Sequence, residues 1–401
     1  MARFLVSGVI RLGCAFLIAL PALGQVTNGK KPDLPKPFAT KSVGNGPVDS
    51  KPAAGFLPQA PNGFQVSVYA KDFTGPRFMA VAPNGDVFVA ESGAGQIVVL
   101  RRAAEAGGTP KKELFADKLT RPFGIAFHDD YVYVGNTDAV VRFRYDNQTS
   151  KRAGAAERIM DLPPGGGHWT RTITFSRDGN KLYISIGSSS NIGIEKDQRR
   201  AAVLVTDPDG KNARIYASGL RNAVGLAIEP LSGAVWVSVN ERDELGDNLP
   251  PDYFTSLRDG GFYGWPYSYI GDNVDPRVRP QRPDLVARAI IPDVLLGAHV
   301  APLQFAFYTA KQFPEQYRGG AFIAEHGSWN RATRSGYQVA FVGFKEGKAV
   351  EGPVPFLTGF NPDPKGKNVD GRPVGVAAAP DGSLLVSDDG AGVIYRVSYG
   401  K

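Results

Sequence analysis

Six stretches of this chain share one pattern of apolar and polar positions. In each stretch, a short apolar run leads into a turn and then into a second run rich in β-branched and aromatic residues. Turn dipeptides such as Asn84-Gly85 and Asp381-Gly382 separate the two runs. The equivalent position in the second run is held by Phe88, Tyr133, Tyr183, Trp236, Phe322 and Leu385. A unit of this kind cannot bury its own faces, so the pattern predicts a stack of repeated β-units.

The spacing of these equivalent positions predicts the architecture. They lie 45, 50 and 53 residues apart at first, and then 86 and 63 residues apart. The short spacings suit one four-stranded blade per repeat. We therefore predict an all-β fold, a six-bladed β-propeller of four-stranded antiparallel blades over residues 61–401. The longer spacings predict a loop insertion at about residues 242–300, which we expect to be ordered and functional.

An alternating apolar and polar stretch, FQVSVYA at residues 64–70, precedes the first repeat. Such alternation is typical of a half-buried strand. We predict that this N-terminal strand joins the last blade and closes the ring, because closure removes two exposed sheet edges.

The first 60 residues differ from the repeats. Arg3, an apolar run and the small residues of Ala22-Leu23-Gly24 predict a signal peptide over residues 1–24, and hence a periplasmic or secreted protein. Arg11 and Pro21 interrupt the apolar run, which argues against a retained membrane span. Residues 25–60 are rich in Pro and Lys, and we predict a flexible segment or one that lies over the domain.

Composition excludes several kinds of chemistry. Cys14 is the only cysteine, so a chain without its leader has no disulfide, thiol nucleophile or zinc–cysteine site. The formal net charge is +7, but Arg3 and Arg11 belong to the leader and residues 25–51 carry a further +3. The propeller would keep only about +2, which argues against nucleic acid as a partner.

His168 is the histidine whose context points most clearly to function. It follows three glycines and precedes Trp169, immediately before the first apolar run of the third repeat. In a propeller we expect this position at the mouth of the central channel, where an imidazole can accept a proton at neutral pH. The alternative is a structural loop histidine stacked on Trp169. His128 is expected in a polar turn and His299 in a packed loop.

Cationic and hydrogen-bonding side chains gather at other repeat boundaries. Arginine opens four of the repeats, at Arg121, Arg171, Arg221 and Arg372. Arginines at equivalent positions suggest a basic ring that could hold carboxylates or phosphates. The segment that ends the fifth repeat adds His326, Trp329, Asn330 and Arg331. This set suits a planar anion, while a satisfied histidine at the end of the blade is the alternative for His326.

An acidic loop follows the second run of the fourth repeat. Four carboxylates fall within seven residues, at Glu241, Asp243, Glu244 and Asp247, and Gly246 allows a tight turn. Oxygen ligands at this density suit Ca²⁺, although the spacing is not that of an EF-hand. The alternative is a loop closed by salt bridges.

Five segments, in the same order, resemble the soluble quinoprotein sugar dehydrogenases, and the sorbosone dehydrogenase branch in particular. They are GGHWTRTITFSRDGNKLYISIGSSSNI, GLRNAVGLAIEP, VNERDELGDN with GGFYGWP, AEHGSWNR, and GRPVGVAAAPDGSLLVSDD. The resemblance covers about residues 60–400, and the soluble glucose and aldose sugar dehydrogenases are more distant. It implies an exported six-bladed propeller that uses pyrroloquinoline quinone (PQQ) and calcium.

The resemblance also implies roles for individual residues. His168 would be the general base, and Arg221 would polarise the quinone carbonyl. Cofactor contacts would come from Arg221, Asn222, His326, Trp329, Asn330, Arg331 and Arg372. Calcium ligands would come from Glu241, Asp243, Asp247 and Tyr263. Soluble glucose dehydrogenases carry an Asp beside the catalytic histidine, whereas this chain reads Ser188-Ser189-Ser190-Asn191, so the partner that orients the histidine stays open.

These features predict an enzyme that oxidises the hydroxyl of an aldose, or the hydrate of an aldehyde sugar such as a sorbosone. Electrons would pass to a separate acceptor, because the sequence contains no haem motif. One alternative is a calcium-dependent lactonase, which needs a metal ringed by acidic and asparagine side chains from several blades. The other is a non-catalytic propeller that binds proteins or glycans, because fold alone does not fix function.

Overall fold

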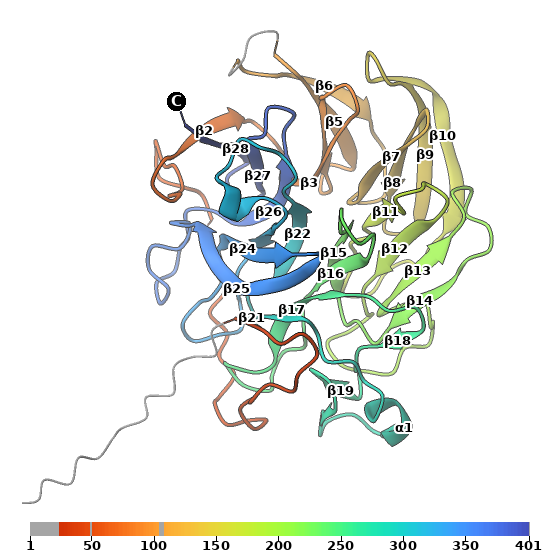
Figure 1. Ribbon diagram of the computed structural model, residues 1–401, viewed down its shortest axis with the longest axis vertical. Helices are drawn as coiled ribbons and strands as arrows, with labels where there is room; N and C mark the ends of the chain where they lie inside the picture. The colour runs from red at the N-terminus through yellow and green to blue at the C-terminus, as the bar shows by residue number, and fades with distance from the viewer. Residues whose placement is uncertain (1–23, 49, 104–107, 401) are drawn as a thin grey trace, which may run out of the picture.

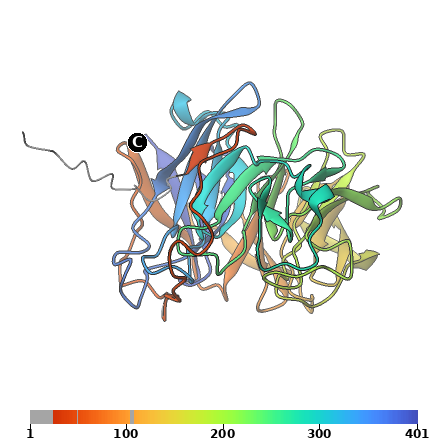
Figure 2. The same cartoon turned by 90° about the horizontal axis from the view of Figure 1, so that it is seen from below.

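A computed structural model describes residues 24–48, 50–103 and 108–400. Most of the described strands form six sheets around a common axis (Figure 1), the exception being a separate two-stranded sheet, and the ring is seen edge-on in Figure 2. The predicted leader lies outside the described residues, apart from Gly24. Within the described residues, no helix has the length and apolar character needed to cross a bilayer.

The first three blades follow one another along the chain. The first contains β3 (Pro76–Val81), β4 (Val87–Glu91), β5 (Gln96–Arg101) and β6 (Lys111–Ala116). The second contains β7 (Ile125–His128), β8 (Tyr131–Gly135), β9 (Ala139–Asp146) and β10 (Lys151–Asp161). The third contains β11 (Ile173–Phe175), β12 (Leu182–Ile186), β13 (Ala202–Thr206) and β14 (Arg214–Ser218). Within each blade the strands pair antiparallel in chain order, so one sequence repeat is one blade.

The last three blades are less regular. The fourth contains β15 (Ala223–Ile228), β16 (Val235–Val239), β17 (Pro251–Ser256) and β21 (Val294–Ala298), with β1 (Gln25–Val26) at its edge. The fifth contains β22 (Pro302–Phe307), β23 (Ala321–Glu325), β24 (Gln338–Lys345) and β25 (Lys348–Leu357). The sixth contains β26 (Pro373–Ala378), β27 (Leu384–Asp388), β28 (Val393–Tyr399) and β2 (Phe64–Ala70). These sheets confirm the predicted six-bladed propeller.

Strand β2 confirms the predicted closure of the ring. It pairs antiparallel with β28, so the first long strand and the last strand of the chain share one blade. Cα partners run from Phe64 opposite Tyr399 to Ala70 opposite Ile394. The ring is therefore held together by a full β-ladder between the two ends of the domain.

The inner strands of neighbouring blades approach closely around the axis. A Cβ atom added to Gly225 in β15 would lie 2.4 Å from the Leu303 carbonyl oxygen of the next blade. A Cβ atom on Gly375 in β26 would likewise lie 2.4 Å from the Arg77 oxygen of the first blade. Glycine is therefore required at these contacts for steric reasons. The closely packed inner strands give the centre of the ring a rigid frame.

The insertion predicted at residues 242–300 is smaller than the sequence suggested. The interval contains β17 and β21, which are the two outer strands of the fourth blade. The inserted part is residues 257–293, with β18 (Gly261–Phe262), β19 (Ser268–Tyr269), β20 (Asn273–Val274) and the short helix α1 (Pro283–Val286). The fifth blade adds one 3₁₀ turn, η1 (Glu315–Tyr317). Strand β18 pairs parallel with β14, so the insertion also extends the third blade.

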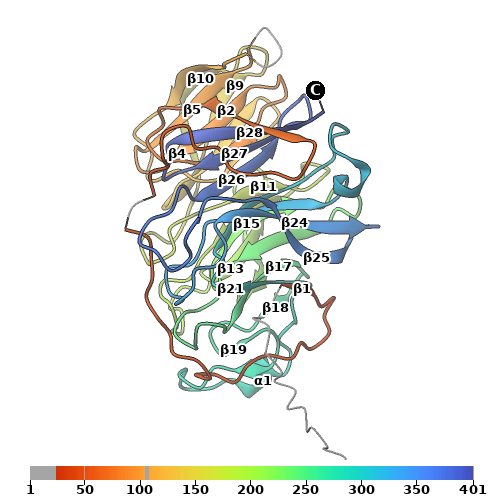
Figure 3. The ribbon, with the colours of Figure 1, turned by 90° about the vertical axis from the view of Figure 1, so that its left-hand side faces the viewer.

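Residues 24–48 and 50–60 form a strap along the outside of the ring (Figure 3). The strap starts at β1, which pairs with β21 of the fourth blade. Further along, the Asn45 amide donates to the Trp329 carbonyl of the fifth blade, and the Val48 amide donates to Lys367 before the sixth blade. The described part of this Pro/Lys-rich segment thus lies over the domain, which was one of the two sequence alternatives.

Candidate functional site

A cavity of about 350 Å³ lies where the inner strands of the third to sixth blades begin. We call it the central pocket. It is lined by residues just before β11, β15, β22 and β26 and by residues just after β16 and β23. The first and second blades supply none of its lining residues. The cavity falls within the roughly 300–1,000 Å³ range of pockets for small-molecule ligands.

The central pocket brings together most of the residues that the sequence singled out. His168 and Arg221, from the loops before two neighbouring blades, line the same cavity. The other predicted residues that line it are Asn222, Glu241, Asp243, His326, Trp329, Asn330 and Arg372. Trp329 is 55% exposed, so its indole lines the pocket at the solvent-exposed side and is not part of the core.

The imidazole of His168 is oriented by Ser188. Its Nδ1 lies 3.0 Å from the Ser188 carbonyl oxygen and 2.8 Å from the Ser188 hydroxyl. A carbonyl oxygen can only accept a hydrogen bond, so Nδ1 carries the proton and Nε2 is the basic atom. Burial, followed by the charge of Arg221, lowers the pKa of His168 to about 3. The imidazole is therefore neutral at physiological pH and available as a proton acceptor.

Two buried arginines hold the loop that carries His168. Arg171 is fully buried and donates to the carbonyl oxygens of His168, Thr170 and Pro163. Arg200 donates to the carbonyl oxygens of residues 163–165. The sequence placed Arg171 in a basic ring at the channel, but its guanidinium faces the backbone of its own loop instead. Arg171 therefore holds the backbone at His168 and does not line the pocket itself.

Arg221 is the buried cation of the pocket, with 5% of its surface exposed. Its Nη2 lies 3.0 Å from Asn191 Oδ1 and 3.1 Å from Asp243 Oδ2. Its Nε donates to the Asn191 carbonyl oxygen, and its Nη1 donates to Asn240. Burial lowers its pKa from the ordinary arginine value, while Asp243 opposes that shift. Four hydrogen bonds thus fix the guanidinium beside His168.

His326 is held on a different partner. Its Nε2 lies 2.9 Å from Asp389 Oδ1, and Arg77 pairs with the other oxygen of the same carboxylate. Burial, followed by the charge of Arg372, lowers the pKa of His326 to about 4. Arg372 is anchored by bonds to the carbonyl oxygens of His326 and Gly327. This side of the pocket is therefore a cationic network with one central carboxylate.

The acidic side of the pocket comes from one blade. Glu241, Asp243 and Asp252 all belong to the fourth blade and line the cavity. Burial raises the pKa of Asp252 to about 8, so this acid is protonated at neutral pH. Because the acids do not come from several blades, the arrangement required by the lactonase alternative is not present among the residues lining this cavity.

Two buried oxygen atoms in the pocket lack hydrogen-bond partners. They are Glu241 Oε1 and Asn222 Oδ1. Oxygen atoms of this kind suit a hard cation or a donor group of a ligand. Across residues 24–48, 50–103 and 108–400, however, no group of three or more His, Cys, Asp or Glu side chains is placed to hold a metal ion.

Three predicted site residues lie elsewhere. The Tyr263 hydroxyl is buried and donates to the Ser256 carbonyl oxygen, because the ring packs into a core cluster shared by the third and fourth blades. Asp247 accepts hydrogen bonds from the backbone amides of Val43 and Ala332, so it ties the strap to the fifth blade. Arg331 lines a second cavity instead of the central pocket. The four predicted calcium ligands therefore do not form one set.

The structure adds lining residues that sequence reasoning did not single out: Asn240, Asp252 and His299. His299 Nε2 bonds the Gly246 carbonyl oxygen at 3.0 Å, while Asn330 Nδ2 approaches its Nδ1 at 3.3 Å. The sequence carried one signal for this residue. His299 lies a few residues before the inner strand of the fifth blade, β22, as Arg221 and Arg372 lie shortly before theirs.

The central pocket of this propeller combines three imidazoles, two guanidiniums and several amides and carboxylates, a set of side chains that can bind a small polar or anionic ligand. The chain belongs to the TrAA12-like family, whose pattern it matches over residues 58–250 and 284–400.

Relatives and solved structures agree with this assignment. An uncharacterised protein of Borreliella burgdorferi is 30% identical over 86% of this chain and 91% of its own length. A PQQ-dependent pyranose dehydrogenase of Coprinopsis cinerea is 26% identical over 70% of this chain, which spans 44% of that protein. A calcium structure of a Trichoderma reesei enzyme of carbohydrate-active family AA12 superposes with a TM-score of 0.75, at 20% identity, and covers 88% of this chain and all of the other.

Proposed function

We propose that this protein is a quinoprotein dehydrogenase that oxidises an aldose hydroxyl, or the hydrate of an aldehyde sugar such as a sorbosone. PQQ would be held in the central pocket, with calcium beside it. The name of the Coprinopsis cinerea relative, a PQQ-dependent pyranose dehydrogenase, supports the substrate class and the cofactor. The reduced cofactor would pass its electrons to a separate acceptor.

One observation carries the proposal. A neutral imidazole and a buried guanidinium, from the loops before two neighbouring blades, line one cavity that is large enough for a planar cofactor. Oxidation of a hydroxyl group requires removal of a proton from its oxygen and of a hydride from the carbon that bears it. A base and a cation beside an electron-pair acceptor meet those two requirements.

His168 would take the proton from the substrate hydroxyl at Nε2. Its Nδ1–H would keep its hydrogen bond to Ser188, and this bond would fix the ring orientation and the tautomer throughout the reaction. The imidazolium formed in this step is disfavoured by burial and by Arg221. We expect the negative charge of a bound anion to reduce that penalty, and His168 would therefore be a stronger base in the loaded protein than in the empty one.

The pocket residues fit a flat, negatively charged cofactor. Arg221 and Arg372 stand on different blades and can each face an oxygen of the guest, while Asn222 and Asn330 offer amides. Trp329 supplies an exposed ring against which a planar system can stack. When bound, PQQ supplies the electron-pair acceptor. Arg221 would stabilise the negative charge that develops on it.

Calcium fits the pocket in part. Glu241 Oε1 and Asn222 Oδ1 are the buried oxygens without partners, and the calcium structure of the Trichoderma reesei enzyme supports a cation in this fold. Since these side chains are too few for the six to eight ligands that Ca²⁺ takes, the remaining ligands would be carbonyls, water and the cofactor. A bound cation would act as a Lewis acid at this site.

The test is reconstitution of the purified protein with PQQ and Ca²⁺, followed by dye reduction with a panel of aldoses and aldosuloses. We expect turnover that needs both additions and that His168→Ala removes without unfolding the protein. Saturable quinone binding with no dye reduction on any sugar would contradict the substrate class. Lactone hydrolysis without added quinone would contradict the redox assignment.

We also propose that residues 1–24 direct export and that the enzyme works in the periplasm or outside the cell. The charged start and apolar run of the leader support this. N-terminal sequencing of the protein from a periplasmic fraction is the check, and we expect the chain to begin at Gln25. A chain recovered intact from the cytoplasm would contradict the proposal.

A further inference from the structure

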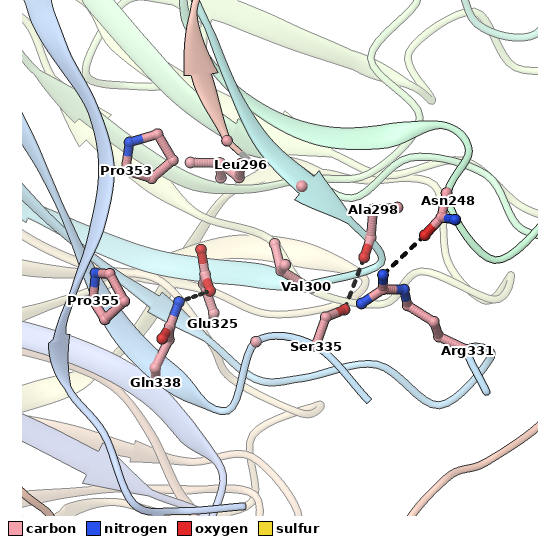
Figure 4. A pocket seen from close by; sticks show the side chains of 13 residues that line it. Asn248, Leu296, Ala298, Val300, Glu325, Arg331, Ser335, Gln338, Pro353 and Pro355 are labelled. Carbon is pink, nitrogen blue, oxygen red and sulfur yellow. Dashed lines mark hydrogen bonds between the residues drawn. The ribbon is translucent and has the colours of Figure 1, made fainter. Parts of the chain in front are cut away.

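A second cavity of about 220 Å³ lies between the fourth and fifth blades (Figure 4). We call it the rear cavity. Glu325 lines it, and the next residue, His326, lines the central pocket. Arg331 also lines the rear cavity, whereas its neighbour Asn330 lines the central pocket. One loop therefore forms part of the wall of both cavities.

Glu325 has an incompletely bonded carboxyl group in the rear cavity. Its side chain is buried, with 1% exposed. Oε2 accepts a hydrogen bond from Gln338 Nε2 at 2.8 Å, but Oε1 has no partner. Figure 4 shows that second oxygen turned away from Gln338. A buried polar atom without a partner is costly, so this oxygen indicates a group that the cavity is built to receive.

The hydrogen-bond pattern fixes the form of this carboxyl group. Because no cation is paired with Glu325 in the described chain, burial raises its pKa to about 8, although the hydrogen bond from Gln338 opposes the shift. Oε2 already receives a donor from Gln338, so the proton belongs on Oε1. At neutral pH, Glu325 thus presents an O–H donor to the cavity.

Two other polar groups of the rear cavity can donate to a ligand. Arg331 gives Nη2 to Asn248 Oδ1 at 2.9 Å and Nε to the Asp247 carbonyl oxygen, and within the described residues no carboxylate lies at ion-pair distance from it, although the nearby charge of Asp247 partly offsets the burial that lowers its pKa. Because Asn248 Oδ1 is already engaged by Arg331, its amide nitrogen is left to donate. Ser335 gives its proton to the Ala298 carbonyl oxygen, so its hydroxyl can only accept from a ligand. The walls between these groups are apolar and come from Leu296, Val300, Pro353 and Pro355.

We propose that the rear cavity binds a compact organic carboxylate. Its carboxylate would accept hydrogen bonds from the Arg331 guanidinium and from the protonated Glu325, and its carbon skeleton would contact the prolines and Val300. An arginine without a direct ion pair and a neutral acid favour an anion over an amine. The volume is below the range of roughly 300–1,000 Å³ for larger ligands, so the ligand is small.

Isothermal titration of the purified chain with acetate, lactate and gluconate, in a buffer without carboxylates, tests this proposal. Ethanolamine and sorbitol serve as the cationic and neutral probes. We expect saturable binding of at least one carboxylate, with affinity lowered at least tenfold by Glu325→Leu and by Arg331→Met. Glu315→Gln, at an exposed glutamate in η1, should leave binding unchanged. Thermal unfolding of each variant shows whether it is folded.

Three results would overturn the proposal. One is the absence of saturable binding for every carboxylate. A second is stronger binding of ethanolamine than of the carboxylates. The third is binding that Arg372→Leu removes but Glu325→Leu leaves intact, since that pattern would place the ligand in the central pocket. No arm of the experiment needs quinone or turnover, so its outcome is independent of the proposed enzyme activity.

Discussion

The two histidine-bearing sides of the central pocket hold the same side chain on different partners. On the third-blade side, His168 bonds a serine through Nδ1, and its loop is held by arginines that donate to carbonyl oxygens. On the fifth-blade side, His326 bonds through Nε2 to the carboxylate of Asp389, which also pairs with Arg77. Burial lowers the pKa of both imidazoles, so both are neutral at physiological pH and the difference lies in their partners. We expect His168, which is held by a serine, to act as the base, and His326, which belongs to a buried ion network, to matter more for stability.

The largest expected effect comes from removing the base. His168→Ala should lower turnover of the reconstituted enzyme by ~10²–10⁴-fold, the usual contribution of a positioned general base. Loss of its bonds to Ser188 should cost about 0.5–1.5 kcal/mol of unfolding free energy. Dye-linked rates at saturating sugar and urea unfolding measure the two effects. If His326→Ala lowered turnover as much as His168→Ala, the distinction between the two sides would be wrong.

Removing the charge beside His168 should have the next largest effect. Arg221→Met should reduce turnover by about 10²–10³-fold, as the loss of a group that stabilises transition-state charge does. Arg221→Lys keeps the charge but not the planar fork that reaches both Asn191 and Asp243. Relative to Arg221→Met, we expect Arg221→Lys to recover more of the quinone affinity than of the turnover rate. Equal recovery of affinity and rate would show that only the charge of the side chain matters.

Substitutions at His326, on the fifth-blade side, should lower the free energy of unfolding more than the turnover rate. His326→Leu leaves Asp389 paired with Arg77 alone, in a buried site. We expect a loss of about 1–3 kcal/mol of unfolding free energy, measured by urea denaturation. His326→Gln keeps a donor for Asp389 and should recover most of this loss. A His326→Leu protein as stable as the wild type would contradict a structural role for the pair.

A pH-dependent effect on stability concerns Glu325, beside His326. Its pKa of about 8 exceeds the ordinary glutamate value, so between those two values the folded chain holds one more proton at this residue than the unfolded chain. Its contribution to stability is therefore lost as pH rises toward 8. Glu325→Gln should flatten the fall in unfolding free energy between pH 5 and pH 8 by up to about 1.4 kcal/mol per pH unit. An unchanged slope would mean that the carboxyl is ionised throughout.

The regular part of the fold was predictable because each repeat carries its own local pattern. Phe88, Tyr133 and Trp236 occupy equivalent positions in β4, β8 and β16, as the apolar spacing indicated. The fourth blade was harder to predict, because the insertion of residues 257–293 separates β17 from β21. Spacing alone could not distinguish an insertion between blades from one within a blade.

The site was predictable only in part, for a different reason. Residues at the starts of strands, such as Arg221 and Arg372, are placed by the fold itself, and both line the central pocket. The direction of a loop side chain depends on contacts that no repeat encodes. Arg171 turns back onto its own loop, and Tyr263 packs into the core cluster shared by the third and fourth blades. Ser188 could not be recognised as the partner of His168 until the loop after β12 was placed beside it.

The most direct measurement of the central claim is a titration of the purified protein with PQQ in the presence of Ca²⁺, followed by absorbance. A saturable complex with one quinone per chain is predicted, and its affinity should fall sharply in Arg221→Met and Arg372→Leu. If the wild-type protein bound no quinone, or if both variants bound it as tightly as the wild type, the imidazole and guanidinium would not be converging on an anionic guest, and the redox assignment would be wrong.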